Sequence, residues 1–128
     1  MEINFKGSLI TLSSEYVGTA TPWEDGYVRD YHVVTVSVND TIFEFDYYCG
    51  VSDLDDLELV NALFCFLSDA ITYLDYSDID EFQSEFGYEK VSQCLKVFNG
   101  CKKSYEDWEK TGLPLCEMAG YLQETYNI

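Results

Sequence analysis

The first fifty residues alternate between apolar and polar positions with a period of two, which is typical of strands that bury one face. In EINFKGSLITLS, Ile3 and Phe5 alternate with polar neighbours before the run becomes continuously apolar. A second run, YHVVTVSV, ends at Asn39-Asp40, and a third, TIFEFDYY, follows directly. Two β-branched and aromatic runs joined by so short a turn predict an antiparallel hairpin. The segment TATPWEDG, which contains a proline and a glycine, is predicted to be the loop between the first two strands.

From residue 52 the apolar positions recur with the helical period of about 3.6 residues. Ser52 followed by Asp55 resembles a capping box at the start of a first helix. The predicted apolar stripe of this helix consists of Leu54, Leu57, Val60, Leu63, Phe64, Leu67, Ile71 and Leu74. A short second helix is expected to begin at Ser77 or Asp78 and to end at Gly87. Its predicted inner face consists of Ile79, Phe82 and Phe86.

Two further helices are predicted in the C-terminal third of the chain. One runs from about residue 89 to about residue 110, and Pro114 opens another at its first position. The last helix is expected to bury Leu115, Met118 and Leu122. Strands followed by helices predict an α+β fold, with an N-terminal antiparallel sheet of about three strands packed against three to four C-terminal helices. A length of 128 residues fits one domain spanning residues 1–128.

Charge narrows the classes of partner, because the chain has 24 acidic and 7 basic residues and a net charge of −17. Between Arg29 and Lys90 there are 15 carboxylates and no Lys or Arg. Nucleic acid and anionic membranes are disfavoured as direct ligands, since both are bound through clustered Lys and Arg. Aromatic residues make up 16% of the chain, which is unlike a disordered acidic tail. A basic partner, such as a nucleic-acid-binding protein, is therefore favoured.

The carboxylates of this base-free region have two interpretations. Several lie in the predicted first turns of helices, where the macrodipole stabilises each by about 0.3–1 kcal/mol. Capping accounts neither for the lack of any compensating Lys nor for Asp69, Asp75, Glu85 and Glu89. We therefore predict a partner-binding surface, and solubility alone is the alternative. Its residues are Asp53, Asp55, Asp56, Asp75, Asp78, Asp80, Glu81, Glu85 and Glu89, with Tyr76 as an aromatic contact.

Other kinds of site fit the sequence less well. Clustered Asp and Glu supply the oxygen ligands that calcium prefers, but neither acidic run has EF-hand spacing. The single histidine, His32, lies in a strand pattern and cannot supply a multi-histidine metal site. The five cysteines contain no CxxC pair and are typical of reduced thiols, and no GxSxG, P-loop or Rossmann motif occurs. We expect no enzyme activity, no metal and no cofactor.

Four motifs follow one another in the order DYHVVTVSV, FEFDYYCG, DEFQSEFGYE and SQCLKVFNGCKK, over about residues 28–104. The matching residues are Phe82, Glu85, Phe86, Gly87 and Tyr88, preceded by Asp69-Ala70 and followed by Ser92 and Cys101. This order resembles a family of short, acidic, uncharacterised proteins of tailed bacteriophages that share the EFGY element. The chain departs from the family pattern after Tyr88, where EKVSQ replaces a run that carries Asp and Arg. The family has no assigned catalytic residues, so none are carried over.

By class and charge, small acidic phage proteins resemble anti-defence inhibitors, including anti-CRISPR proteins and anti-restriction DNA mimics. The resemblance implies an inhibitor that binds a basic DNA-binding surface of a host effector nuclease in the bacterial cytoplasm. The alternative is a structural or regulatory interaction protein of the phage, also non-enzymatic. A homodimer is a third hypothesis, formed through the helix that carries Leu115, Met118, Tyr121 and Leu122. No signal peptide and no run of roughly 20 apolar residues is visible.

Overall fold

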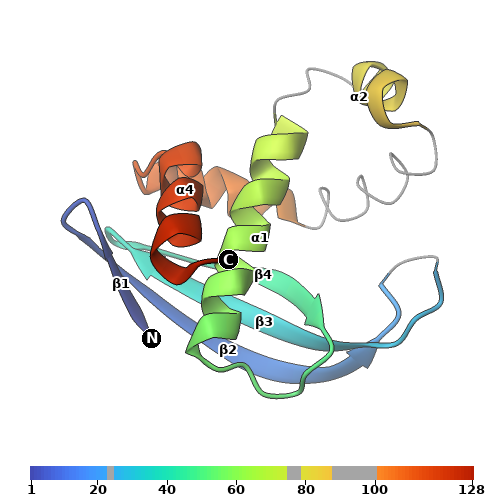
Figure 1. Ribbon diagram of the computed structural model, residues 1–128, viewed down its shortest axis with the longest axis horizontal. Coiled ribbons are helices and arrows are strands. Elements are labelled where there is room, and N and C mark those ends of the chain that lie inside the picture. The colour runs from blue at the N-terminus through green and yellow to red at the C-terminus, as the bar shows by residue number, and fades with distance from the viewer. Residues whose placement is uncertain (23–24, 75–78, 88–100) are drawn as a thin grey trace.

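The computed structural model describes residues 1–22, 25–74, 79–87 and 101–128 (Figure 1). In chain order its elements are β1 (Glu2–Phe5), β2 (Ser8–Ala20), β3 (Arg29–Val38), β4 (Thr41–Cys49), α1 (Asp56–Leu74), α2 (Ile79–Phe86), the helical residues 101–110 and α4 (Leu115–Tyr126). The strands form one antiparallel sheet in the order β1-β2-β3-β4. Figure 1 shows α1 and α4 on the same side of the sheet. The predicted α+β fold is confirmed, with four strands in place of about three.

The additional strand arises because the first predicted strand folds back on itself as a hairpin. Lys6 and Gly7 have φ values of 50° and 82°, so both occupy the left-handed region that a two-residue type I′ turn requires. Asn39 and Asp40, with φ values of 48° and 65°, make the second such turn and confirm the predicted β3–β4 hairpin. The predicted loop between strands is shorter than expected, because Ala20 still belongs to β2 and pairs with β3.

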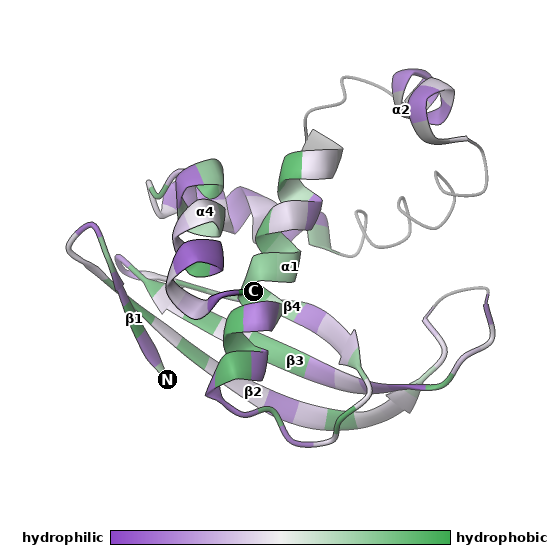
Figure 2. Cartoon of the chain, in the orientation of Figure 1, coloured by the Kyte–Doolittle hydropathy of each residue, from purple (hydrophilic) through white to green (hydrophobic). Residues whose placement is uncertain are grey.

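Strand register places the alternating apolar residues on one face of the sheet. Val34 pairs with Phe45 and Val36 pairs with Phe43, so the two β-branched residues meet two aromatic rings across the strands. Figure 2 shows the matching alternation of hydrophobic and hydrophilic bands along the strands. The side chains that this face buries are Ile3, Phe5, Ile10, Leu12, His32, Val34, Val36, Val38, Phe43 and Phe45. We call this the inner face, and the helices cover it.

The first helix begins three residues later than the predicted capping box implies. Asp55 is the capping residue, because its Oδ1 accepts a hydrogen bond of 2.8 Å from the Glu58 backbone N–H. The N-cap is therefore Asp55, and the prediction of Ser52 was wrong. The predicted stripe is also partly wrong, since the Leu57 side chain is 54% exposed. The residues that α1 buries are Leu59, Val60, Ala62, Leu63, Phe66, Leu67 and Ala70.

Aromatic rings join the helices to the sheet. Phe66 of α1 packs against Phe45 of β4 at a centroid distance of 4.5 Å, and against Tyr105 at 4.7 Å. Trp108 is fully buried, meets the Phe43 ring edge-on, and donates its indole N–H to the Leu113 carbonyl at 3.0 Å. Helical residues 101–110 thus lie against β4, the edge strand of the sheet.

The last helix uses its apolar face within the chain. Met118 and Leu122 are buried, as predicted, and Leu115 is half-buried. Tyr121 lies with its ring centroid 5.1 Å from that of Phe5 in β1. Pro114 precedes the helix as its N-cap residue and is not its first helical residue. The face predicted to meet a second copy is therefore occupied by the core of the same chain.

The short second helix and the third helix are described in part. Gly87, with a φ of 84°, ends α2 as predicted, and its N–H donates to the Gln83 carbonyl at 2.8 Å. The packing predicted for Ile79, Phe82 and Phe86 lies outside the described side chains. Residues 101–110 are helical, whereas the predicted start of that helix, from 89 to 100, lies outside the described residues.

Candidate functional site

The predicted partner-binding surface is described at six of its ten residues. Asp53, Asp55 and Asp56 are exposed at the N-terminal end of α1. Asp80, Glu81 and Glu85 are exposed on α2. Asp75, Tyr76, Asp78 and Glu89 lie outside the described residues.

The six described residues form two groups at opposite ends of α1. This helix has 19 residues, which at a rise of 1.5 Å per residue span roughly 28 Å. Figure 1 places α2 beyond the C-terminal end of α1. Asp55 and Asp56 at the other end have a structural role in capping the helix and in its first turn. The macrodipole of α1 therefore offsets part of their negative charge.

A third acidic surface, absent from the sequence prediction, lies on the side of the sheet that faces away from the helices. No element of the described ranges covers it (Figure 1). We call it the outer sheet face, and its residues along β3 and β4 are Tyr31, Val33, Ile42, Glu44, Asp46 and Tyr48. The alternation of the strands explains it, because each of these residues neighbours one that points into the core.

Three exposed carboxylates lie on this face. Glu44 and Asp46 are two residues apart on β4, which corresponds to about 7 Å along the strand. Glu15 of β2 pairs with Val33, which in turn pairs with Asp46. Two strand spacings therefore separate Glu15 from Asp46, or about 10 Å. All three carboxylates are exposed.

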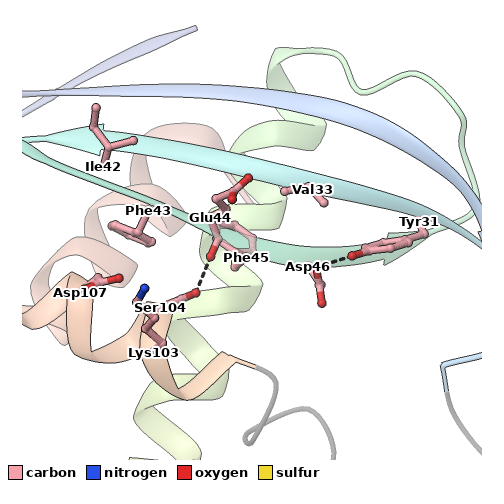
Figure 3. A pocket seen from close by; sticks show the side chains of 10 residues that line it. All are labelled: Tyr31, Val33, Ile42, Phe43, Glu44, Phe45, Asp46, Lys103, Ser104 and Asp107. Carbon is pink, nitrogen blue, oxygen red and sulfur yellow. Dashed lines mark hydrogen bonds between the residues drawn. The ribbon is translucent and has the colours of Figure 1, made fainter.

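A groove of about 450 Å³ borders this face where helical residues 101–110 run beside β4 (Figure 3). One wall is formed by Lys103, Ser104 and Asp107. The other is the β4 edge of the sheet, where the outer-face residues Tyr31, Val33, Ile42, Glu44 and Asp46 lie together with Phe43 and Phe45 of the inner face. The Ser104 hydroxyl donates to the Glu44 backbone carbonyl and fixes the helix against the edge strand. Asp107 Oδ1 accepts a hydrogen bond of 3.0 Å from the Lys110 ammonium group.

Two tyrosines form a stacked pair at one end of the groove. The rings of Tyr31 and Tyr48 have centroids 5.0 Å apart and planes inclined by 25°. The Tyr31 hydroxyl donates to Asp46 Oδ1 at 2.7 Å. This hydrogen bond is the largest cause of a raised Tyr31 pKa, and burial is the largest cause of the raised Tyr48 pKa. Both phenols therefore stay protonated beside the carboxylates at neutral pH.

Most of the positive charge in the described ranges is already neutralised by internal ion pairs. Five of the seven Lys and Arg lie in these ranges, since Lys90 and Lys96 do not. Three of the five make ion pairs, namely Lys6 with Glu117, Arg29 with Asp25 at 2.9 Å and Lys110 with Asp107 at 3.0 Å. Of the other two, Lys103 lines the groove beside Glu44 and Asp46.

The buried histidine is arranged as a structural residue. His32 lies in β3, as predicted, and its Nε2 is 2.8 Å from the Val51 carbonyl, to which it donates. The Cys49 thiol donates to the same carbonyl at 3.4 Å. Burial is the largest cause of a raised Cys49 pKa, so this thiol stays protonated. A protonated thiol and a histidine that both donate to one carbonyl do not make a nucleophile and its base.

The described cysteines and acidic side chains show no other chemistry. Cys49, Cys65, Cys101 and Cys116 are free thiols, and Cys94 lies outside the described residues. Within the described ranges no three His, Cys, Asp or Glu side chains gather in a way that holds a metal ion. No helix in these ranges has the length and hydropathy needed to cross a membrane. No protein-family model, curated protein or solved structure matches this chain.

Proposed function

We propose that this chain is a non-enzymatic binding protein that occupies a cationic, nucleic-acid-binding surface of another protein. The observation that carries the proposal is the outer sheet face, where the three exposed carboxylates of Glu15, Glu44 and Asp46 lie about 7–10 Å apart across paired strands. Surfaces that bind nucleic acid present Lys and Arg to phosphates. A domain with carboxylates at fixed positions matches such a surface in charge and excludes the nucleic acid from it.

The class of partner follows from the resemblance to tailed-phage proteins. Host effector nucleases are the cationic proteins that a phage gains most by blocking, and an anti-CRISPR type of inhibitor is the form we propose. Guided nucleases read a short motif in duplex DNA with Arg side chains and hold displaced DNA on a basic surface. Either surface, in the bacterial cytoplasm, is a suitable target. The competing hypothesis is a phage structural or regulatory protein whose acidity serves solubility only.

A nuclease-protection experiment tests the proposal. Purified chain is added to a guided nuclease and to a restriction nuclease, and DNA binding and DNA cleavage are measured at about 50 mM and about 200 mM salt. We expect loss of DNA binding at the lower salt and substantial recovery at the higher salt, since attraction between exposed charges is screened. An unrelated acidic protein of similar net charge is the control for nonspecific polyanion effects.

The result that contradicts the proposal is equally direct. If no nuclease or other basic nucleic-acid-binding protein loses DNA binding beyond the effect of the acidic control, the chain does not act on cationic surfaces. Capture of a phage structural protein instead, in a pull-down from infected cells, would favour the competing hypothesis.

A further inference from the structure

The outer sheet face combines exposed apolar surface with carboxylates. Ile42 is 71% exposed and Leu9, on the same side of β2, is 46% exposed. Sheets that carry helices on one face only usually solvate the other with polar residues. Here the exposed Ile42 lies two residues from Glu44 on β4 and lines the groove together with Tyr31 and Asp46. Apolar contact area and negative charge thus occur together on this face.

We propose that the outer sheet face is where the partner docks, and that the groove beside β4 receives an arginine side chain of that partner. This inference rests on the function proposed above and assigns it to a surface. Charge complementarity commits it to a basic occupant, because the exposed carboxylates of Glu15, Glu44 and Asp46 outnumber Lys103, the one lysine that lines the groove in the described ranges. The base at the end of this face, Arg29, is held by Asp25 through both of its terminal nitrogens.

The chemistry of the groove favours arginine over lysine. A guanidinium is planar, stacks on tyrosine rings and donates two parallel hydrogen bonds to one carboxylate. The Tyr31 ring, which lines the groove and stacks on Tyr48, offers the aromatic surface, and Asp46 and Glu44 offer the carboxylates. A lysine ammonium gains less from either partner, because it is compact and strongly hydrated.

The edge of the sheet does not offer a different mode of docking at this site. A partner strand extends the sheet at β4 only by pairing with the outward backbone N–H and C=O groups of β4. The Glu44 carbonyl already accepts the Ser104 hydroxyl. Helical residues 101–110 therefore cover this edge, and a partner reaches the carboxylates from the face of the sheet.

The acidic end of α1 is a weaker site for a basic partner. Asp55 already accepts a backbone N–H, and the positive end of the helix macrodipole lies under Asp53 and Asp56. A sheet has only a small net dipole, so no macrodipole offsets the negative charge of the carboxylates on the outer sheet face. Equal numbers of carboxylates are therefore expected to attract a cation more strongly on the sheet than at the helix end.

Charge-matched variants test the inference with a defined probe. Binding of a fluorescent nona-arginine peptide, with nona-lysine as comparison, is measured on the full chain by anisotropy at low salt. The sheet variant is Glu44→Gln with Asp46→Asn, and the rival variant is Asp53→Asn with Asp56→Asn. Glu106→Gln with Glu109→Gln, at two exposed positions of helical residues 101–110, is the control for net charge. Each variant changes the charge by the same two units.

We expect the sheet variant to weaken nona-arginine binding by about tenfold, and the other two variants by less than about threefold. Ile42→Ala should weaken nona-arginine binding more than Leu57→Ala does. Leu57→Ala is the matched control, because it also removes exposed apolar surface, but from α1. Nona-arginine should bind wild-type chain more tightly than nona-lysine does.

Two results overturn the inference. If all three charge variants lose the same affinity, or if the α1 variant loses more, the outer sheet face is not the docking surface. In that case a positive nuclease-protection result would still support the proposed function. Absence of nona-arginine binding to wild-type chain overturns the inference directly. Circular dichroism and thermal unfolding of each variant show whether its fold is intact, and a destabilised sheet variant is replaced by the single change Glu44→Gln.

Discussion

The Ser104 hydroxyl donates a hydrogen bond to the backbone carbonyl of Glu44, which lies sixty residues earlier in the sequence. Glu44 belongs to the edge strand β4, so this contact satisfies one of the outward backbone groups of the sheet. Ser104 itself is buried. The hydrogen bond thus closes the sheet edge and positions one wall of the groove.

Replacing Ser104 with alanine should leave the Glu44 backbone carbonyl without a hydrogen-bond partner next to a buried side chain. We expect Ser104→Ala to lower the free energy of unfolding by about 1–2 kcal/mol, measured by urea denaturation. Ser84→Ala, the same change at an exposed position of α2, is the control and should be close to neutral. Equal effects of the two substitutions would mean that the contact between helix and edge strand does not stabilise the fold.

The helix cap provides a direct comparison between two candidate capping residues. Because the Asp55 carboxylate accepts the Glu58 N–H, Asp55→Ala should lower the free energy of unfolding by about 1 kcal/mol. Ser52→Ala should have little effect, since α1 begins at Asp56 and Ser52 is exposed. Denaturant unfolding of both variants checks this prediction, and a larger effect at Ser52 would restore the capping box that the sequence predicts.

The turn between β1 and β2 requires a residue that tolerates the left-handed region. Gly7 has a φ of 82° and open space around the position of a Cβ atom, so an alanine there is penalised by backbone conformation alone. We expect Gly7→Ala to cost about 1 kcal/mol of unfolding free energy. Gly50→Ala is the control, because that glycine has equal space without a left-handed φ. A neutral Gly7→Ala would contradict the assigned turn.

The stability of the fold should depend on the pH through one half-buried carboxyl group. Burial raises the pKa of Asp69 on α1 to about 6, from an ordinary value of 3.8. The folded state therefore binds the proton more tightly than the unfolded state. The contribution of Asp69 to the free energy of unfolding is fully present below about pH 4 and is lost as the pH rises through about 6.

A difference between variants isolates this contribution from the repulsion among the other carboxylates. Asp69→Asn should be more stable than wild type by about 1–2 kcal/mol at pH 8, and this advantage should shrink below pH 5. Asp53→Asn, at an exposed position, controls for the loss of one negative charge and should show no such pH dependence. Denaturant unfolding from pH 4 to pH 8 measures both. A constant difference between Asp69→Asn and wild type across this range would refute the assignment.

The order of elements was predictable because local patterns dictate it. Alternation of Val34, Val36 and Val38 with polar residues, followed by Asn39-Asp40, sufficed to predict the β3–β4 hairpin. The β1–β2 turn was missed because Lys6-Gly7 lacks the Asn-Gly or Asp-Gly signature, and the apolar run continues beyond it. Leu57 was misplaced because the helical period repeats on more than one face of α1, and only packing decides which face is buried.

The sequence by itself determined the fold class, the strand alternation and the regional excess of carboxylates, since all three depend on residues close together in the chain. Tertiary structure decided which carboxylates share a surface. Strand pairing brings Glu15 and Asp46 within about 10 Å of each other. Asp56, in contrast, lies in the first turn of α1, and Asp80 lies on α2, which follows the other end of α1. The helices of the described ranges also cover only one face of the sheet (Figure 1). That arrangement depends on long-range packing of Phe66 and Trp108, and it leaves Glu44 and Asp46 exposed beside the groove.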